Sequence, residues 1–322
     1  MSVEKSEIET NRQFNPNHSE LELRPEQVQK YAQLLTSEIG HGFVVDGIIE
    51  IGSYAKGEAV PGSDMDTRVY ISSPDFYVWQ TSGSRLSACR QKEAEQKFAD
   101  FLQINKDRQC LTLDWYDFND PVAKRLCQEL GLNVEFGLAD SRFAEYELQK
   151  LSTQVTTEHQ LLLESNLVYD PKGLLAKRRA GIKGVIYPVM ALYYQERYLD
   201  ALPFEIYTHL QPHKMDNWKI EKSRQIQWVK WAVRSIRDAI GAKNYIQSGK
   251  LIYKKEDILS FCSINLSPTD VAVIEELYRW KTDPEIREQI IDGFLVDPDK
   301  YFSLFKEYTK KLEKIVRRIK DL

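Results

Sequence analysis

The sequence has few of the features that mark disulfide-rich, zinc-binding or membrane-spanning proteins. Its four cysteines form no C-x-x-C pair and have no histidine at ligand spacing, which argues against a structural zinc site and against a disulfide framework. The longest apolar stretches, such as residues 184–194, are too short and too interrupted to cross a bilayer. The first ten residues, MSVEKSEIET, lack the apolar core of a signal peptide. We therefore expect a cytoplasmic protein without a membrane partner.

Basic residues are not in excess either. The chain has 44 lysines and arginines against 48 aspartates and glutamates, a formal net charge of −4, so it has no overall positive field to attract nucleic acid. We also find no long basic stripe with interleaved aromatic residues, the pattern that binds single strands. The sequence therefore argues against a nucleic-acid partner.

The pattern of the chain changes near residues 150–172. Before this region strand-like and helix-like segments alternate, whereas after about residue 170 long helical patterns follow one another. One of them places Ile226, Val229, Val233, Ile236 and Ile240 at three- and four-residue spacings, as on the apolar face of a helix. The 322 residues are enough for about two domains. We expect an α+β protein, with a mixed sheet flanked by helices in residues 1–165 and an all-helical bundle in residues 166–322.

Turn and capping signals divide the N-terminal half into short elements. Helices are expected over residues 24–39, 85–104 and 121–131, and a further helical region runs from about 143 past 159. Strands are expected over residues 43–53, 65–71, 110–118 and 132–139, and one helical turn over residues 55–59.

Residues 50–71 read EIGSYAKGEAVPGSDMDTRVYI and contain two features at a fixed separation. Gly52 and Ser53 follow one expected strand, and Asp64 and Asp66 stand one residue apart where the next begins. Side chains alternate between the faces of a strand, so the two carboxylates point to the same face, with Cα atoms roughly 6.5–7 Å apart.

This pairing suits a nucleotide with a divalent cation. Two converging carboxylates repel each other and are costly to bury, and Mg²⁺ resolves that conflict because it prefers oxygen ligands and keeps substrate phosphates in its shell. A glycine lets the backbone approach a ligand closely, and backbone N–H groups at a turn, with a serine hydroxyl, can bind phosphate oxygens. The sequence therefore predicts a site for Mg²⁺ and a nucleoside triphosphate.

The stretch GSYAKGEAVPGSDMDTRVYI resembles the signature of the nucleotidyltransferase superfamily, which has the polymerase-β-like fold. That family carries an apolar strand, a G-S pair, a later glycine and then S-D-x-D leading into another strand. The matching residues are Gly52, Ser53, Gly57, Ser63, Asp64 and Asp66. The resemblance covers roughly residues 25–170. It implies that Asp64 and Asp66 bind Mg²⁺ and that Gly52 and Ser53, with Ser63 beside them, contact the nucleotide.

The family also implies a third carboxylate on a later strand, for which the sequence offers two candidates. Asp114 lies in LTLDWYDF and Glu135 in NVEFGLAD. We prefer Glu135, because the chain that follows it, with LVYDP and a glycine at residues 167–173, is similar to bacterial antibiotic adenylyltransferases, where a strand glutamate is the general base. The helix expected between the two strands leaves Asp114 open as the alternative.

Several basic residues could assist. Lys56 either approaches the phosphates from the loop or is simply exposed to solvent. Lys177, Arg178 and Arg179 could meet a triphosphate or an acidic substrate, but a solvated helix face is the favoured interpretation.

The expected activity is Mg²⁺-dependent transfer of a nucleoside monophosphate, AMP from ATP in the first instance, to a hydroxyl with release of pyrophosphate. The expected acceptor is a small polar molecule such as an aminoglycoside-like compound, since the negative net charge suits a cationic acceptor. The alternatives are transfer to a protein or RNA, and a non-catalytic nucleotide-binding regulatory or interaction protein.

Overall fold

The computed structural model describes residues 25–60, 63–81, 88–114, 120–131, 133–150, 157–209 and 222–322, and this part of the chain is a mixed α/β protein in which helices predominate. The chain divides into two units. Unit 1 takes the chain up to Tyr54, Ala59–Phe143 and Asn166–Gly173, and unit 2 takes Ala55–Glu58, Ala144–Ser165 and Leu174–Leu322. This differs from the single boundary expected between residues 165 and 166, because a strand that follows this boundary pairs with the sheet of unit 1.

Unit 1 is built around two small sheets. Its elements are α1 (Pro25–Ile39), β1 (Val44–Glu50), α2 (Gly52–Ala55, whose last residue falls in unit 2), β2 (Met65–Ser72), β3 (Phe76–Thr81), α3 (Ala88–Ile104), β4 (Gln109–Asp114), α4 (Asp120–Leu130), β5 (Val134–Asp140) and β6 (Asn166–Tyr169).

The larger sheet is mixed, with the strand order β5-β2-β1-β6. β1 runs antiparallel to both β2 and β6, whereas β2 and β5 are parallel. β3 and β4 form a separate parallel pair. The two central strands of the larger sheet, β1 and β2, therefore carry the two halves of the sequence motif at adjacent ends.

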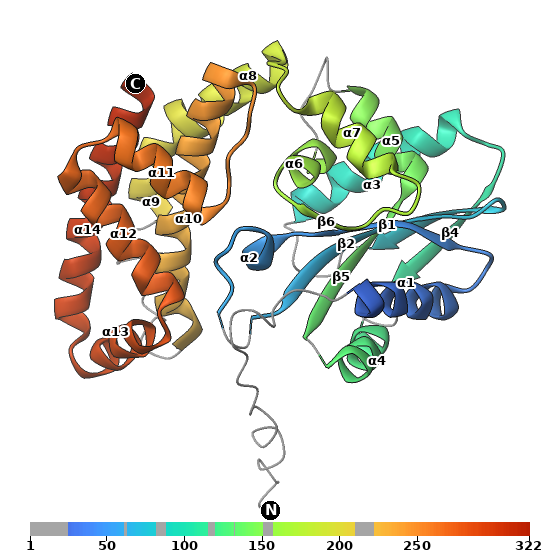
Figure 1. Ribbon diagram of the computed structural model, residues 1–322, viewed down its shortest axis with the longest axis horizontal. Helices are drawn as coiled ribbons and strands as arrows, with labels where there is room; N and C mark the ends of the chain where they lie inside the picture. The colour runs from blue at the N-terminus through green and yellow to red at the C-terminus, as the bar shows by residue number, and fades with distance from the viewer. Residues whose placement is uncertain are drawn as a thin grey trace, which may run out of the picture. The chain divides into compact units, whose positions relative to one another are not determined.

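Helices α1 and α4 cover one face of this sheet (Figure 1). Alternate residues of the strands point into the core beneath them, which also takes the apolar faces of both helices. Its members include Tyr31 and Leu35 of α1, Ile48, Val69, Phe136 and Leu126. The alternation leaves the opposite side of β2 and β5 to Asp66 and Glu135.

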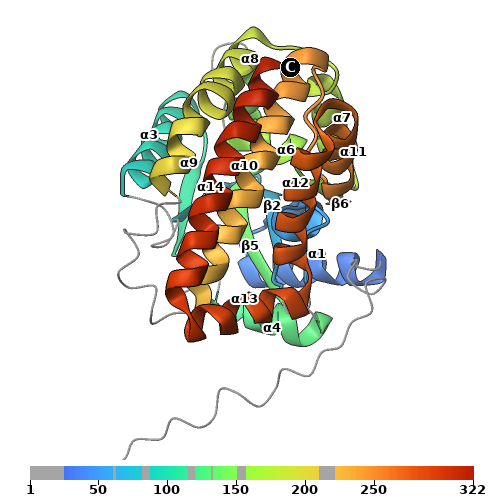
Figure 2. The same cartoon turned by 90° about the vertical axis from the view of Figure 1, so that its left-hand side faces the viewer.

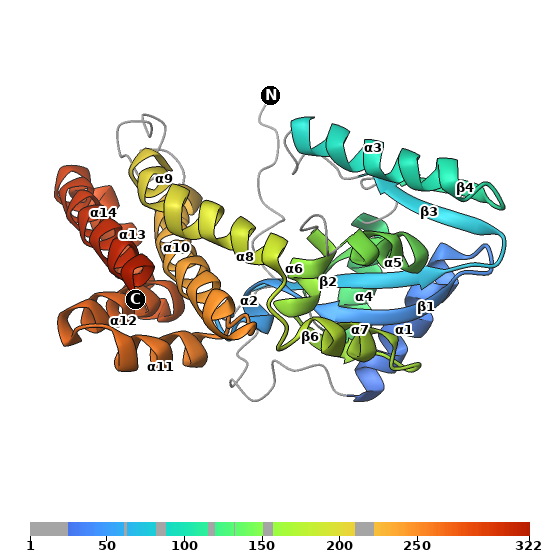
Figure 3. The same cartoon turned by 90° about the horizontal axis from the view of Figure 1, so that it is seen from above.

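Helix α3 lies along the two-stranded sheet, as Figure 3 shows. The ring of Trp79 on β3 stacks on Phe98 of α3 at 4.6 Å between centroids, and Tyr77 meets Phe101 edge to face at 4.9 Å. Such aromatic contacts add to the burial that holds a two-stranded pair in place.

Most elements expected from the sequence are present, with shifted ends. The expected strand over residues 110–118 is described only as Gln109–Asp114, and the rest of it lies outside the described residues. The helical turn expected over residues 55–59 is instead Gly52–Ala55, directly at the motif. Strands β3 and β6 were not expected from the sequence.

Unit 2 is helical. Its elements are most of α5 (Ser141–Gln149), then α6 (Thr157–Leu163), α7 (Leu174–Ile182), α8 (Pro188–Tyr194), the π-helical segment η4 (Gln195–Ala201), α9 (Leu202–His209), α10 (Lys222–Ser248), α11 (Lys255–Asn265), α12 (Pro268–Thr282), α13 (Pro284–Val296) and α14 (Pro298–Asp321).

The long helices of unit 2 pack lengthwise, with α10 beside α14 and α12 (Figure 2). Trp228 of α10 stacks on Phe305 of α14 with ring centroids 4.3 Å apart. Ser267, Asp283 and Asp297 cap the starts of α12, α13 and α14 through their side-chain oxygens, and a proline follows each cap. These are the usual start signals of helices. Within the described ranges, no helix is both long enough and apolar enough to cross a membrane.

Candidate functional site

The Gly52-Ser53 turn lies directly against the D-x-D pair. Gly52 has φ +71°, and a Cβ atom built on it would stand only 2.2 Å from Oδ2 of Asp66. The neighbouring Ile51 N–H donates to the carbonyl oxygen of Asp66 at 2.8 Å. Both the backbone conformation and the space therefore require glycine here. The turn and Asp66 form one local arrangement within unit 1.

A second contact joins the same two segments. The hydroxyl of Tyr54 donates to the carbonyl oxygen of Ser63 at 3.2 Å. Burial raises the pKa of Tyr54, and the negative charges of Glu50 and Asp64 raise it further. The Tyr54 hydroxyl thus remains a neutral donor close to the carboxylate of Asp64.

Ser63 closes the turn that leads into the D-x-D pair. Its hydroxyl accepts the N–H of Val60 at 3.0 Å, and its own N–H donates to the Val60 carbonyl at 2.8 Å. The structure therefore gives Ser63 a turn-forming contact beside Asp64, while its expected contact with a nucleotide stays a prediction. Ser53 is half-buried within α2.

The two aspartates differ in exposure. Asp64 stands just before β2 and is exposed, whereas Asp66 is on the strand and half-buried. Between and after them, Met65, Thr67 and Val69 are buried on the other face. Asp66 thus lies on the face that the expected alternation gives it, beside the turn, whereas Asp64 precedes the strand and is open to solvent. That both carboxylates share one face stays a prediction.

Glu135 is the third carboxylate that the strand order brings to this place. It is the Cα partner of Asp66 in the parallel β2–β5 pair, and neighbouring strands lie about 4.8 Å apart. Thr67 supports this pairing from the opposite face, because its hydroxyl bonds to the Glu135 carbonyl at 3.2 Å and to the Tyr31 hydroxyl at 2.6 Å. Burial raises the pKa of Tyr31, so this hydroxyl stays neutral.

Asp114, the alternative, lies farther away in the fold. It ends β4, where its Cα partner is Thr81 of β3. β3 in turn meets β5 through side-chain contacts, with the Val78 N–H donating to Asp140 at 3.1 Å and the Leu138 N–H to Gln80 at 2.7 Å. Two strands, β3 and β5, therefore stand between Asp114 and Asp66, and we keep Glu135 as the candidate.

The basic residues singled out in the sequence have partners within unit 2. Lys56 pairs with Glu164 at 3.3 Å, and Arg178 pairs with Glu145. Arg179 donates to the carbonyl oxygens of Leu162 and Ser165, at 2.8 Å in both cases. Arg178 and Arg179 therefore make contacts that hold the fold together, and Lys177 is exposed. A role for Lys56 at the phosphates stays a prediction.

Sequence reasoning missed Arg68 as part of this face. It follows Asp66 by two residues on β2 and is the Cα partner of Gly137, which follows Glu135 by two on β5. A Cβ atom on Gly137 would stand 3.3 Å from Nη1 of Arg68, so the guanidinium lies over the glycine. A glycine inside a strand is a known sign of close approach and could have indicated this contact.

Within the described part of the chain, no three His, Cys, Asp or Glu side chains come together as a metal-binding group. The donors present fit a different arrangement. Mg²⁺ is commonly held by one or two carboxylates together with substrate phosphates, rather than by a cage of protein ligands. Asp64 and Asp66 beside a close-approach turn match that requirement.

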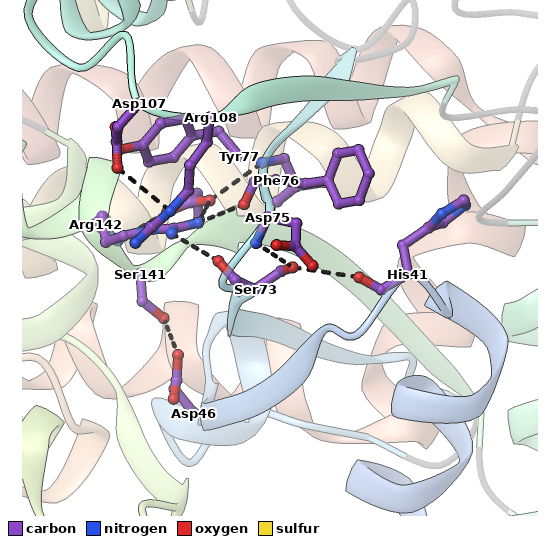
Figure 4. A network of polar contacts seen from close by, with 12 residues as sticks. His41, Asp46, Ser73, Asp75, Phe76, Tyr77, Asp107, Arg108, Ser141 and Arg142 are labelled. Carbon is purple, nitrogen blue, oxygen red and sulfur yellow. Dashed lines mark hydrogen bonds and ion pairs between the residues drawn. The ribbon is translucent and has the colours of Figure 1, made fainter.

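The opposite end of the larger sheet holds a second polar network, drawn in Figure 4. Arg142 donates to both carboxylate oxygens of Asp140, at 3.0 and 2.9 Å, and to the carbonyl oxygens of Ser73 and Phe76, at 2.8 and 2.6 Å. Its guanidinium also lies over the ring of Tyr77, 4.3 Å from the centroid. This network ties the β2–β3 turn to the start of α5.

Asp46 belongs to the same end of the sheet. Ser141 donates to one of its carboxylate oxygens at 2.7 Å and Lys172 to the other at 2.9 Å. Burial by itself raises the pKa of Asp46, but hydrogen bonds from Ser72, Lys172 and Ser141 outweigh it and hold the pKa below its usual range. These contacts make Asp46 a structural carboxylate.

Comparison with known proteins adds nothing to this site, since the chain matches no family model and no curated protein. The candidate site is therefore defined by the geometry of this chain.

Proposed function

We propose that this protein is a Mg²⁺-dependent nucleotidyltransferase whose unit 1 has the polymerase-β-like fold. The reaction proposed is transfer of a nucleoside monophosphate, AMP from ATP in the first instance, to a hydroxyl group, with release of pyrophosphate. The single observation that supports it most is the approach of Gly52 to Asp66, where a Cβ atom would meet the carboxylate at 2.2 Å.

This approach matters because it brings the two features of the sequence motif together at one place. A glycine turn alone and a D-x-D pair alone are both common. Here the turn that can bind phosphate oxygens ends in contact with a carboxylate that can bind a cation, and Asp64 beside it is exposed. A triphosphate carrying Mg²⁺ needs both functions within a few ångströms.

Asp64 and Asp66 are the residues that would hold the metal. When bound, Mg²⁺ supplies neutralisation of the phosphate oxygens and stabilises the charge that develops on them. The chain itself would bind the β- and γ-phosphates through the backbone of Gly52 and Ser53. Glu135, in register with Asp66, would orient the acceptor hydroxyl and take its proton.

The proposed step is a displacement at the α-phosphorus of the nucleotide. The acceptor oxygen forms a bond to the α-phosphorus, the bond from that phosphorus to the oxygen bridging to the β-phosphorus breaks, and pyrophosphate leaves with the bridging oxygen. The hydroxyl proton passes to Glu135. No redox partner is needed.

The acceptor proposed is a small polar molecule with a free hydroxyl, such as an aminoglycoside-like compound. The net charge of −4 favours a cationic acceptor over a polyanion. A hydroxyl of a protein or of RNA is the alternative acceptor and is part of the test below.

The test is pyrophosphate release from each of the four nucleoside triphosphates in the presence of Mg²⁺ and a panel of hydroxyl-bearing acceptors. We expect release that requires one acceptor and disappears in Asp64→Asn. Glu135→Gln and Asp114→Asn form a matched pair, in which only the first should lose turnover while both bind nucleotide.

Other outcomes separate the rivals. Release only with protein or RNA acceptors would reassign the acceptor. Nucleotide binding without release under any condition would indicate a non-catalytic nucleotide-binding protein, and no nucleotide binding at all would contradict the proposal.

A further inference from the structure

The loop between the Gly52-Ser53 turn and the D-x-D pair is divided between the two units. Gly52, Ser53 and Tyr54 belong to unit 1, the next four residues, Ala55–Glu58, belong to unit 2, and from Ala59 the chain is again in unit 1. The segment that directly follows the proposed phosphate-binding turn is thus held by the helical unit.

Glu58 is a buried charged residue of this segment. The residue is 3 % exposed, and its carboxylate meets two cations from different helices. Nη1 of Arg237, on α10, lies 3.3 and 3.5 Å from its two oxygens, and Nζ of Lys281, on α12, forms an ion pair with one of them. We call Glu58, Arg237 and Lys281 the Glu58 cluster.

Arg237 is buried as well and the side chain of Lys281 is only 13 % exposed, so the charges of the cluster depend on one another. Burial lowers the pKa of Lys281, and the carboxylate of Glu58 acts against that effect. Burial also acts to lower the pKa of Arg237, but the carboxylates of Asp238, Glu58 and Glu164 outweigh it and the pKa is raised. Without the charge of Glu58, both cations would be left in a poorly solvated place.

The residues just before Glu58 are attached too. Lys56 pairs through Nζ with Glu164 at 3.3 Å, and its carbonyl oxygen accepts the N–H of Lys255 at 3.1 Å. Gly57 has φ +67°, and a Cβ atom there would be in contact with Glu256 at 3.4 Å. Lys56 and Glu58 are therefore both held by contacts within unit 2, and the Cβ position of Gly57 between them lies close to Glu256.

Stabilisation of the fold does not by itself explain why the chain has such a cluster. Buried ion pairs contribute little compared with apolar residues of the same size, whereas a buried charge that loses its partner is strongly destabilising. In some proteins a buried ion pair instead specifies one geometry, because only that arrangement satisfies all its members. Here the ion pairs would fix the geometry of Ala55–Glu58, the segment that begins two residues after Ser53.

We propose that Glu58 is a positioning residue for the nucleotide. Its ion pairs with Arg237 and Lys281 hold the segment that carries Lys56 and follows Gly52 and Ser53, so that the turn is already shaped for the triphosphate before it binds. This inference rests on the proposed function. It makes nucleotide affinity depend on Arg237 of α10 and Lys281 of α12 through their ion pairs with Glu58.

The experiment compares Glu58→Gln with Asp270→Asn in the full-length chain. Asp270 is a matched control, because it is 6 % exposed, lies on α12 like Lys281, and pairs with Arg318 of α14. Titrations with the Mg²⁺ complexes of ATP, GTP, CTP and UTP give the dissociation constants. Hydrogen exchange of peptides covering residues 51–58, without nucleotide, reports how firmly the segment is held.

We expect Glu58→Gln to weaken nucleotide binding at least tenfold and to speed exchange across residues 51–58 at least tenfold. In turnover assays KM for the nucleotide should rise more than kcat falls. Asp270→Asn should lower thermal stability while leaving the dissociation constant within twofold and exchange in these peptides unchanged. If Glu58 had only a structural role, Glu58→Gln would lower thermal stability without changing the dissociation constant or the exchange over residues 51–58.

The inference is overturned if Glu58→Gln binds nucleotide like the wild type, or if exchange over residues 51–58 does not change. If Glu58→Gln does not fold, Lys281→Met takes its place, since it leaves the Arg237 contact, and the same two readouts apply. A wild type that binds none of the four nucleotides would instead overturn the proposed function and this inference with it. Normal wild-type binding with no effect of either variant would overturn this inference alone.

Discussion

The two ends of the larger sheet in unit 1 both carry aspartates, but the surroundings of those aspartates differ. At the end where β5 finishes, Arg142 and the N–H of Val78 enclose Asp140, and Lys172 pairs with Asp46. Ser141 also donates to Asp46, as Figure 4 shows. At the end where β2 begins, Asp64 is exposed and the turn at Gly52 lies against Asp66.

The difference separates carboxylates that serve the fold from carboxylates that are suited to a ligand. A buried carboxylate surrounded by the chain's own donors is stable but has no room for a substrate or a metal ion. A carboxylate beside a glycine turn and next to an exposed carboxylate has the surroundings that the proposed nucleotide site requires. Both ends carry aspartates, so the neighbouring residues determine which role each carboxylate is suited to.

The largest expected effects come from making the same change at each end, Asp140→Asn and Asp66→Asn. Asp140→Asn weakens the hydrogen bonds to the guanidinium of Arg142, whose side chain is 26 % exposed, so the free energy of unfolding should fall by about 2 kcal/mol. Asp66→Asn should alter the free energy of unfolding by less than about 1 kcal/mol but lower turnover at least about 1,000-fold, or about 4 kcal/mol of barrier. Urea denaturation and pyrophosphate release measure the two quantities.

A double variant serves as the control for this pair. Arg142→Met should cost less stability when added to Asp140→Asn than in the wild type, because the contact between the two side chains is then already weakened. If Asp66→Asn proved as destabilising as Asp140→Asn, Asp66 would be a structural carboxylate and the contrast between the two ends would fail.

The motif itself was predictable because its signals are local. The glycine turn, the D-x-D pair and the strands around them lie within residues 50–71, and the structure places the turn at Gly52 against Asp66. Strand β6, only four residues long, and β3, with the sequence FYVWQT, carry too little periodicity to be recognised.

Contacts between residues far apart in the sequence could not be predicted from local sequence patterns. The choice between Glu135 and Asp114 depends on strand order, which follows from how the chain folds back and not from either strand's sequence. The contact of Glu58 with Arg237 spans 179 residues, and no pattern near Glu58 indicates a partner. The units of the chain are discontinuous for the same reason, because β6 returns to pair with β1.

A smaller effect on function is expected from Gly52→Ala. This variant adds one methyl group beside Asp66, at the end of the sheet that carries the D-x-D pair. The positive φ costs an alanine about 1–2 kcal/mol, and the methyl would also displace the Asp66 carboxylate, so nucleotide binding should weaken at least about tenfold. Gly40→Ala is the matched control, because Gly40 has φ +64° but no atom within 4 Å of the Cβ position.

Gly40→Ala should therefore lose stability by about the same 1–2 kcal/mol while binding nucleotide normally. Titration with Mg²⁺–nucleotide and urea denaturation of both variants give the comparison. Equal binding by the two alanine variants would mean that the space beside Asp66 is not used by the ligand.

The smallest effect is expected from Lys172→Met at the structural end. Lys172 is 59 % exposed at its side chain, so solvent and salt screen its pair with Asp46 and the loss should be about 0.5 kcal/mol at neutral pH. The pKa of Asp46 is held below its unfolded value, so this stability is present above about pH 4 and is lost as the pH falls through the folded pKa. The difference between wild type and Lys172→Met should therefore vanish in acid and shrink in high salt, whereas the exposed control Lys177→Met should show no such pH dependence. If the difference in the free energy of unfolding persisted in acid, Lys172 would act through the packing of its aliphatic stem. The charges around Asp46 would then contribute less to the fold than the comparison between the two ends of the sheet assumes.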